Sequence, residues 1–360
     1  MNVLLFSRIC AQTGVGNHIK ELAEELHKIG HKVIVVSGTN EIGIPENWFV
    51  QIPIPSLNPF VLLKDIKKIH KIISKEKINV VHCHHRMAAL YMRLYRVFWK
   101  IPVVYTLHLA NIPSDFLHRT MTFSGDRAIG VSTEASSFIV DKLGIPQSKV
   151  VTILNGVDEK KLIPLSLQEK TELREKWNLP DGTIVLAMHC RIDEVKNHMV
   201  VVEALKHLPD SIRNNFVVVC SGSKEGTYYH NLVEEIHEYQ LDSLFRFVGW
   251  SETRKVLGIA DFLVLPSRNE GFALSVCEAF LLKVPVMRTC TAGFSDQKYC
   301  YPIDSDDTAP IETILSDIAI NGLSGYKKQI SEAYDFAISN LTVHKMTEKT
   351  LEVYMSVLDQ

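Results

Sequence analysis

The sequence lacks the features that mark several large classes of protein. It contains no C-x-x-C pair, and its seven cysteines are scattered along the chain. Their odd number and their spacing argue against a disulfide framework and against a zinc ribbon. No apolar run approaches the roughly 18 residues that a membrane-spanning helix requires. The opening stretch MNVLLFSRIC has neither a basic start nor a long apolar core, so we expect no secretory signal peptide and a cytoplasmic protein.

An excess of charge of one sign is also missing. The formal net charge is −2, which gives no indication of a protein that binds nucleic acid. Hydrophobic residues are plentiful and make up 46% of the 360 residues. That proportion suits a soluble globular protein, and the length suits two domains of ordinary size.

Short apolar runs alternate with amphipathic segments in the first half of the chain. Residues 17–29 place Ile19, Leu22 and Leu26 at helical spacing, and Gly30 ends the predicted helix. A second helix is expected at 133–144. Strands are expected at 3–6, 32–38, 79–84, 102–108, 127–132 and 149–158. Short apolar strands separated by helices indicate a parallel sheet that is covered on both faces.

The same pattern restarts near residue 183, after a polar and charged stretch. Strands are expected at 183–190, 216–223, 245–250, 261–267 and 284–289, with helices at 197–208 and 228–239. The predicted fold class is therefore α/β, with two Rossmann-like domains at 1–165 and 166–341. A final helix at about 342–360 is expected to pack back on the first domain. Two such sheets in series imply a cleft between the domains, with ligands at the carboxyl ends of the strands.

A glycine loop follows the first predicted strand. Gly14 and Gly16 lie between that strand and the first helix, where glycine lets backbone N–H groups approach a phosphate. The loop is neither a full G-x-G-x-x-G nor a P-loop. A tight turn between strand and helix explains the two glycines equally well.

Two cations, Arg191 and Lys196, follow the strand at 183–190 and precede a helix. Arginine can hold a diphosphate as a planar fork, and lysine can hold it as a point charge. Asp193 or Glu194 could instead pair with these cations in an ordinary surface network. The sequence leaves both interpretations open at this point.

The stretch SRNEGFALSVCEAF, at 267–280, carries two glutamates eight residues apart. Glu270 falls in the loop after a strand, and Gly271 lets the backbone approach a ligand. A helix should begin near Ala273, with free N–H groups that suit an anion. Glu278 lies about one turn into that helix, where its carboxylate can accept hydrogen bonds from a vicinal diol such as ribose. A polar loop and a glutamate favoured by the helix dipole would give the same pattern.

Taken together, these motifs resemble glycosyltransferase family 4, which comprises retaining enzymes of the GT-B fold that use nucleotide sugars. The resemblance covers nearly the whole chain. The two-glutamate motif of the family matches Glu270 and Glu278, and its Arg-Lys diphosphate pair matches Arg191 and Lys196. The other matching features are its glycine loop, its NG(V/I)D segment and its cleft histidine, at Gly14 and Gly16, 155–158 and His108.

The resemblance implies a role for each of these residues. Transfer of a sugar to a hydroxyl of a glycan or lipid-linked acceptor would directly involve Glu270, His108, Arg191 and Lys196. The donor, a UDP- or GDP-linked sugar, would be bound by Gly14, Gly16, Arg191, Lys196, Gly271, Phe272, Ala273, Leu274 and Glu278. The family uses basic side chains and helix dipoles where other transferases use a metal, so no metal and no other cofactor is implied.

The sequence departs from the family pattern after the strand at 284–289. Family members often have a glycine pair and an acidic residue there, whereas this chain has VPVMRTCTAGFSD. Thr291, Ala292 and Gly293 are expected to form the corresponding loop. Cys190 stands before Arg191, where family members often have glycine.

Four potential metal ligands cluster at His82, Cys83, His84 and His85. On a strand, alternate side chains face opposite ways, so only two of the four could share a site. Carboxylate partners are not obvious, and we therefore expect no metal here. His84 could face the cleft and the acceptor, although a structural histidine is the simpler interpretation.

Residues 64–100 are strongly basic, with ten Lys and Arg against two acidic residues, a balance of +8. A basic face with aromatic residues suits the surface of an anionic membrane. Such contact would place the protein at the inner face of the membrane, in the assembly of lipopolysaccharide or another cell-surface polysaccharide. Because Leu90, Leu94 and Phe98 repeat at four, packing of the aromatic residues in the core is the stronger expectation.

Other functions are compatible with parts of the sequence. A non-catalytic partner subunit that binds a glycan or nucleotide could share the fold, but the intact set of Arg191, Lys196, Glu270 and Glu278 argues against it. A sugar-nucleotide epimerase would turn over its donor without a second sugar acceptor. An NAD-dependent dehydrogenase would need a full G-x-G-x-x-G and an acidic residue about twenty positions later.

Overall fold

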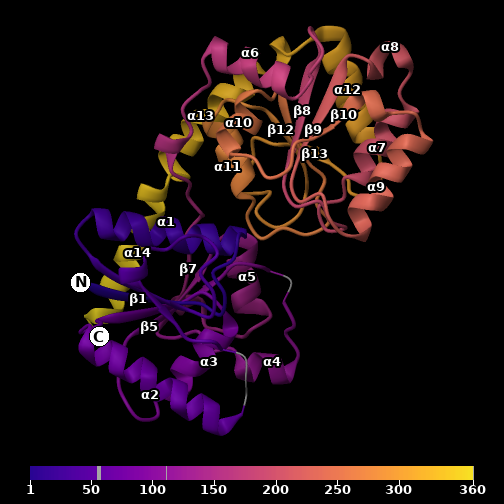
Figure 1. Ribbon diagram of the computed structural model, residues 1–360. Helices are drawn as coiled ribbons and strands as arrows, with labels where there is room; N and C mark the ends of the chain where they lie inside the picture. Colours follow the sequence, from indigo (N-terminus) through magenta and orange to yellow (C-terminus); the bar gives the residue numbers. More distant parts are fainter. Residues whose placement is uncertain (55–57, 111, 360) are drawn as a thin grey trace. The chain divides into compact units, whose positions relative to one another are not determined.

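The computed structural model describes residues 1–54, 58–110 and 112–359. The chain forms two compact units (Figure 1). Unit 1 consists of Met1–Val157 and Asn340–Gln360, and unit 2 consists of Asp158–Ser339. Gln360, the last residue of the helix predicted at 342–360, lies outside the described residues. The boundary predicted at 165 falls within unit 2, after the 3₁₀ turn Glu159–Lys161.

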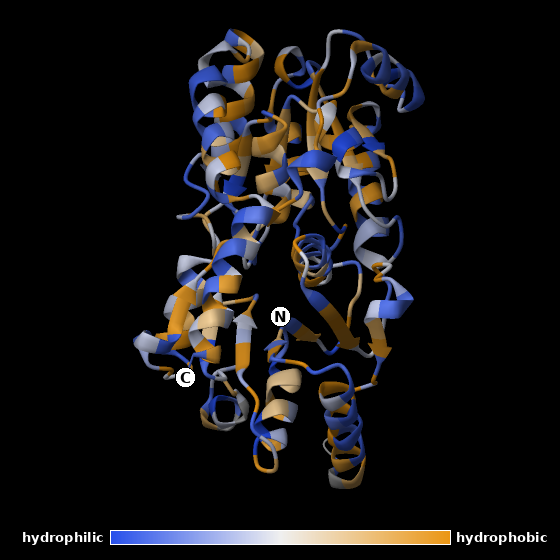
Figure 2. Cartoon of the chain, turned by 90° about the vertical axis from the view of Figure 1, so that its left-hand side faces the viewer, coloured by the Kyte–Doolittle hydropathy of each residue, from blue (hydrophilic) through white to orange (hydrophobic). Residues whose placement is uncertain are grey.

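Unit 1 is built on a seven-stranded parallel sheet in the order β3-β2-β1-β4-β5-β6-β7. Its strands are β1 (Asn2–Phe6), β2 (Lys32–Ser37), β3 (Phe49–Gln51), β4 (Val80–Cys83), β5 (Val103–Leu107), β6 (Arg127–Gly130) and β7 (Val150–Thr152). The central strands are nearly continuous runs of buried apolar residues, which form when helices cover both faces of a parallel sheet. In Figure 2 the strands are largely hydrophobic, whereas the helices carry residues of both kinds.

The helices of unit 1 are α1 (Gly14–Lys28), α2 (Pro59–Lys75), α3 (Arg86–Tyr95), α4 (Phe116–Met121), α5 (Thr133–Asp141) and α14 (Val343–Leu358). α1 begins three residues before the predicted start, because the Thr13 hydroxyl caps it by accepting a hydrogen bond from the Gly16 N–H. α14 lies beside α1 (Figure 1), and its Met346, Val353 and Tyr354 share one hydrophobic core with Leu22 and Leu26.

Unit 2 is built on a six-stranded parallel sheet in the order β10-β9-β8-β11-β12-β13. Its strands are β8 (Ile184–His189), β9 (Phe216–Ser221), β10 (Phe245–Phe247), β11 (Phe262–Leu265), β12 (Val286–Thr289) and β13 (Tyr301–Ile303). Its helices are α6 (Leu167–Lys176), α7 (Met199–His207), α8 (Asp210–Arg213), α9 (Thr227–Glu238), α10 (Thr253–Gly258), α11 (Leu274–Leu281), α12 (Ala309–Asn321) and α13 (Lys327–Asn340).

Both strand orders are those of a Rossmann-like sheet, in which the chain winds outward from the centre in both directions. The predicted α/β class with two Rossmann-like domains is therefore confirmed. The cleft predicted between the domains stays a prediction. Within the described ranges, no helix is long and apolar enough to cross a membrane.

Candidate active site

Unit 1 has a topological switch point between β1 and β4. Ligands of open α/β sheets bind beyond the carboxyl ends of the strands at such a point. The loop after β1 leads into α1, and the residues that follow β4 and β5 lie along the same edge of the sheet. This edge collects Gly14, His84 and His108 within unit 1.

The two glycines of the loop before α1 differ in the space around them. A Cβ on Gly16 would lie 2.0 Å from the carbonyl oxygen of Ala11, so only glycine allows the chain to approach itself there. A Cβ on Gly14 would meet nothing within 4 Å among the described residues. The tight turn thus accounts for Gly16, and the described residues leave open space around Gly14.

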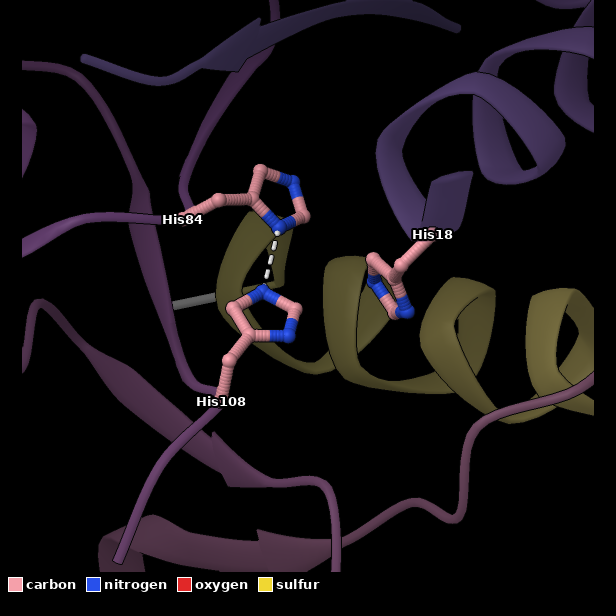
Figure 3. Close-up of side chains that lie close together, drawn as sticks. All are labelled: His18, His84 and His108. Carbon is pink, nitrogen blue, oxygen red and sulfur yellow. Dashed lines mark hydrogen bonds between the residues drawn. The ribbon is translucent and has the colours of Figure 1, made fainter. Parts of the chain in front are cut away.

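Three histidines meet at the same edge of unit 1. His84 follows β4, His108 follows β5, and His18 points from α1 toward both (Figure 3). Nδ1 of His84 and Nε2 of His108 are 3.2 Å apart and share a hydrogen bond. The ring centroid of His18 lies 4.8 Å from that of His108 and 5.3 Å from that of His84. The predicted catalytic residue His108 therefore belongs to a cluster that the sequence did not reveal.

The structure gives the histidines that follow and form β4 different surroundings. His82 and His84 do share one side of β4, but the nitrogens of His82 lie 2.7 Å from the Tyr354 hydroxyl and 2.6 Å from the Thr106 hydroxyl. His82 is therefore a structural residue. The partners of His84 come from β5 and α1, which counting along a single strand cannot reveal.

Burial keeps the imidazoles of the cluster neutral. Loss of hydration lowers the pKa of His18 to about 4. The same cause, with the neighbouring imidazoles adding to it, lowers the pKa of His84 and of His108 well below the usual value. Near pH 7 the cluster therefore offers lone pairs and N–H donors, and no positive charge.

Residues 155–158, Asn-Gly-Val-Asp, have internal structural roles. Oδ1 of Asn155 lies 2.9 Å from Nδ1 of His18 and orients that ring. A Cβ on Gly156 would lie 2.2 Å from the carbonyl oxygen of Thr342, and Val157 pairs with Thr342 in a parallel bridge. The segment therefore positions His18 and also seats the returning C-terminal part of unit 1.

Unit 2 has its switch point between β8 and β11. The loop after β8 carries Arg191 and Lys196, and the loop after β11 carries Glu270. Nζ of Lys196 lies 2.5 Å from Oε1 of Glu270, and Glu270 is only 8% exposed. A charge pair that is shielded from bulk water interacts more strongly than an exposed one. The sequence singled out both residues, but it did not predict that they pair with each other.

Arg191 forms a different ion pair. Its Nη1 lies 3.0 Å from Oδ2 of Asp193, and its side chain is 57% exposed. Oδ1 of Asp193 accepts a hydrogen bond from the N–H of Lys196. Asp193 therefore shapes the loop that carries both cations. Its ion pair with Arg191 is the ordinary surface pairing that the sequence offered as one of two interpretations. Because exposed pairs contribute little free energy, an anion could compete with Asp193 for Arg191.

α11 begins where the sequence placed a second anion site. Gly271 and Phe272 lead into the helix, Ala273 is its N-cap and Leu274 is its first residue. Ala273 offers no side-chain oxygen to the N–H groups of the first turn. The N-terminus of α11 therefore has the properties of an anion site.

Glu278 lies one turn into α11 and is partly buried. Loss of hydration raises its pKa to about 7, and a hydrogen bond from the Thr253 hydroxyl opposes the rise. The ionisation of a carboxyl group with a pKa near neutral responds to any ligand that donates hydrogen bonds to it.

Arg288 of β12 is fully buried and organises the loop that departs from the family pattern. Its guanidinium donates hydrogen bonds to Oε1 of Gln297, to Oγ1 of Thr291 at 2.9 Å and to the carbonyl oxygen of Ala292 at 3.0 Å. Gln297 in turn donates to the carbonyl oxygen of Ala273 at 2.8 Å. Arg288 therefore fixes this loop against the start of α11, a role that the sequence alone did not suggest.

Two family models match the chain. Glycosyltransferase Family 4 matches residues 12–161, and Glycosyl transferases group 1 matches residues 169–297. An uncharacterized glycosyltransferase of Methanocaldococcus jannaschii is 23% identical over 96% of this chain and 95% of its own. The UDP-Gal:alpha-D-GlcNAc-diphosphoundecaprenol alpha-1,3-galactosyltransferase of Escherichia coli is 27% identical over 73% of this chain and 70% of its own.

Solved structures of other proteins have the same fold. One from Rickettsia africae matches with a TM-score of 0.88 and 22% identity, covering 100% of this chain and 99% of its own. HepE of Anabaena, solved in complex with UDP, matches with a TM-score of 0.84 and 16% identity, covering 99% and 100%. The fold and the matched models define a glycosyltransferase of GT-B architecture. The chain belongs to glycosyltransferase family 4.

Proposed function

We propose that the chain transfers a glycosyl unit, with retention at the anomeric carbon, from a UDP-sugar to a hydroxyl of a lipid-linked glycan. The pair formed by Lys196 and Glu270 carries the donor half of this proposal. The pair lies at the switch point of unit 2, and the loop of Glu270 leads directly into α11. A cation and the N-terminus of a helix can bind the phosphates of a sugar diphosphate, and a carboxylate can bind its sugar.

Stabilisation of the leaving diphosphate is the main chemical task. Arg191 and Lys196 supply positive charge, and the start of α11 supplies N–H groups. Because Lys196 is already paired with Glu270, a diphosphate that binds Lys196 would weaken that pair. Glu270 would then orient the donor sugar and stabilise the positive charge that develops on the sugar ring.

The transfer balances without a covalent enzyme intermediate. The bond between the anomeric carbon and the diphosphate oxygen breaks, and the acceptor oxygen forms a new bond on the same face. The acceptor proton passes to the departing diphosphate oxygen. Glu278 would bind the ribose diol, and His108 stays the residue predicted to contact the sugar hydroxyls or the acceptor.

The donor assignment predicts selective stabilisation by one nucleotide. Thermal unfolding should be followed with UDP, GDP, ADP and their sugar conjugates, for the wild type and for Arg191→Ala. A ligand at about 100 times its dissociation constant adds about 2.7 kcal/mol to the free energy of unfolding. We expect this shift with UDP and its conjugates and a much smaller shift in Arg191→Ala.

Arg213→Ala is the matched control, because Arg213 of α8 also pairs with an aspartate, Asp210, away from the switch point. It should keep the full shift. If GDP alone stabilised the protein, the donor would be a GDP-sugar and not the proposed UDP-sugar. The absence of a shift with every nucleotide, in a folded protein, would contradict the proposed donor site.

A membrane-associated acceptor fits the outer face of α2. Phe60 is 84% exposed and Leu63 is 46% exposed, and both line a surface hollow with the side chains of Lys64, Lys67, Lys68 and Lys71. Apolar side chains beside lysines suit the boundary between lipid headgroups and acyl chains. The E. coli relative is named for a diphosphoundecaprenol-linked acceptor. We therefore infer a role in cell-surface polysaccharide or lipopolysaccharide assembly.

The aromatic residues of the basic stretch at 64–100 are partly packed in the core and partly exposed. Tyr91 and Tyr95 are buried in the core, whereas Phe98, one of the three residues whose spacing suggested core packing, is 60% exposed. Trp99 stacks on His70 of α2, with ring centroids 4.0 Å apart. The lipid-facing surface that we propose therefore belongs mainly to α2.

Binding to vesicles tests this surface. The protein should sediment with anionic vesicles at low salt, and a triple variant Lys64→Glu, Lys67→Glu, Lys71→Glu should bind at least tenfold more weakly, since each basic residue near the surface contributes about 1 kcal/mol. A variant with Lys327→Glu and Lys328→Glu, on α13 of unit 2, reverses two lysine charges outside α2 and should bind much like the wild type. Equal binding by all three proteins would argue against α2 as the contact.

A further inference from the structure

The guanidinium of Arg288 is a fully buried charge whose hydrogen-bond acceptors are all neutral. Besides the groups of Gln297, Thr291 and Ala292, it uses the carbonyl oxygen of Thr289, which lies 3.2 Å from its Nε. Within the described ranges it forms no ion pair with a carboxylate. Burying a charge without an opposite charge costs free energy. An anion bound nearby would therefore interact favourably with Arg288.

The side-chain amide of Gln297 joins Arg288 to the start of α11 in one orientation. A guanidinium can only donate hydrogen bonds, and a backbone carbonyl oxygen can only accept them. Oε1 of Gln297 therefore faces Arg288, and Nε2 faces the carbonyl oxygen of Ala273 at 2.8 Å. Gln297 is fully buried, so bulk water does not compete for either bond.

The peptide group that accepts this bond also carries an N–H of the first turn of α11. The carbonyl of Ala273 and the N–H of Leu274 belong to one peptide unit, and Leu274 is the first residue of the helix. N–H groups at this end of a helix have no intrahelical partner. Hydrogen bonds in a chain polarise one another. The charge of Arg288 therefore acts through two amide groups on an N–H that is suited to an anion.

The loop that Arg288 organises also lies against the segment that leads into α11. The Thr289 hydroxyl donates a hydrogen bond to the carbonyl oxygen of Ser267 at 2.6 Å. A Cβ on Gly293 would lie 3.2 Å from the carbonyl oxygen of Gly271, so the two backbones are in close contact there. The buried network thus supports the path of the chain before α11 as well as the polarity of its first peptide groups.

We propose that Arg288 and Gln297 are positioning residues for the diphosphate of the nucleotide sugar. Both side chains are fully buried, so neither contacts the ligand, and they act through the N–H of Leu274. The inference rests on the proposed function and concerns the phosphates of the donor alone. The two residues should therefore contribute to the affinity for UDP and not to the affinity for uridine, which has no phosphate.

The test compares these two ligands by calorimetric titration, with uridine measured in competition with UDP. Arg288→Met removes the charge. Gln297→Glu keeps an acceptor for Arg288 but neutralises its charge and cannot donate to Ala273 when ionised. Each should bind UDP about tenfold more weakly, as expected when a charge-assisted hydrogen bond is lost, and should bind uridine like the wild type. Arg288→Lys keeps the charge and should stay within about threefold of the wild type for UDP.

Two matched controls lie elsewhere in unit 2. Arg246 of β10 also donates only to carbonyl oxygens, and Gln329 of α13 donates to the carbonyl oxygen of Tyr299 at 2.8 Å. Arg246→Met and Gln329→Glu should bind both ligands like the wild type. Circular dichroism shows whether each variant is folded, and if Arg288→Met does not fold, Gln297→Glu decides.

The outcomes separate this inference from the proposed donor site. Wild-type affinity for UDP in Gln297→Glu, or a parallel loss of affinity for UDP and uridine, would overturn the positioning role and leave the donor site in place. A wild-type protein that binds no nucleoside diphosphate would remove the donor site and this inference with it. If GDP is the nucleotide that binds, the same comparison is made with GDP and guanosine.

Discussion

The carboxyl group of Glu278 titrates close to neutral pH, because loss of hydration raises its pKa to about 7. A ribose diol donates hydrogen bonds to the ionised carboxylate, so a bound nucleotide favours ionisation. The affinity for UDP should therefore increase as the pH rises through 7. Between pH 6 and pH 8 we expect the dissociation constant to fall about tenfold, which calorimetric titration can measure.

Glu278→Gln is the control for this prediction, because glutamine does not titrate. The variant should bind UDP more weakly and should retain only the pH dependence that the phosphates of UDP contribute. The same pH dependence in both proteins would remove Glu278 from the proposed ribose site.

At the level of single residues, the sequence could predict where the site residues lie in the fold, but it could not predict which of them contact each other. Lys196 and Glu270 follow strands whose ends can be located from their apolar runs, so the sequence could place both at a sheet edge. Their contact joins residues 74 positions apart, and no local pattern encodes it. His18 was missed because it lies among the apolar residues of an amphipathic helix. A polar residue on that buried face was its only signal.

Among the elements, α14 contacts the sheet of unit 1 through a buried pair of polar side chains. The Tyr354 hydroxyl lies 2.7 Å from Nδ1 of His82, and both side chains are buried. Tyr354→Phe leaves that nitrogen without its partner, at a cost of about 1–3 kcal/mol. We expect the free energy of unfolding, measured in urea, to fall by that amount.

Tyr326→Phe is a useful comparison. The Tyr326 hydroxyl donates to Asp317, whose carboxylate also accepts a hydrogen bond from Asn321 and reaches solvent. Removing this hydroxyl leaves the carboxylate hydrated, so the loss should be smaller than for Tyr354→Phe. Equal losses would show that the contact between Tyr354 and His82 is not specially important to α14.

Several of the elements that the sequence missed are short or weakly patterned, although the long helices α2, α12 and α13 were missed as well. β3 and β13 have three residues each, too few to establish a period. α6 has a single buried residue, Leu173, so it has no apolar stripe. Its one signal is the capping box, in which Ser166 and Glu169 each accept a hydrogen bond from the backbone N–H of the other. Periodicity located the long buried strands because burial determines which residues they contain.

At the scale of the whole molecule, unit 2 is inserted into unit 1. The chain leaves unit 1 after Val157 and returns at Asn340, and the N–H of Val157 bonds to the carbonyl oxygen of Leu341. A fragment of residues 158–339 contains one continuous unit and should unfold cooperatively on its own. A fragment of residues 1–157 lacks α14 and therefore exposes the core around Leu22 and Leu26.

We expect the shorter fragment, 1–157, to show no cooperative thermal transition by circular dichroism. Addition of a peptide with residues 340–360 should restore part of that transition, because the peptide supplies the missing core residues. A sharp transition in the 1–157 fragment alone would contradict the importance assigned to α14.

The insertion also sets an order of events on the ribosome. When residue 157 leaves the exit tunnel, the first unit has its whole sheet but not the helix that covers part of it. Synthesis of residues 158–339 at about 5–20 residues per second takes on the order of ten to forty seconds. Throughout that interval the apolar side chains beneath α14 must be shielded in some other way. The second unit can complete its fold while the first still waits for the end of the chain.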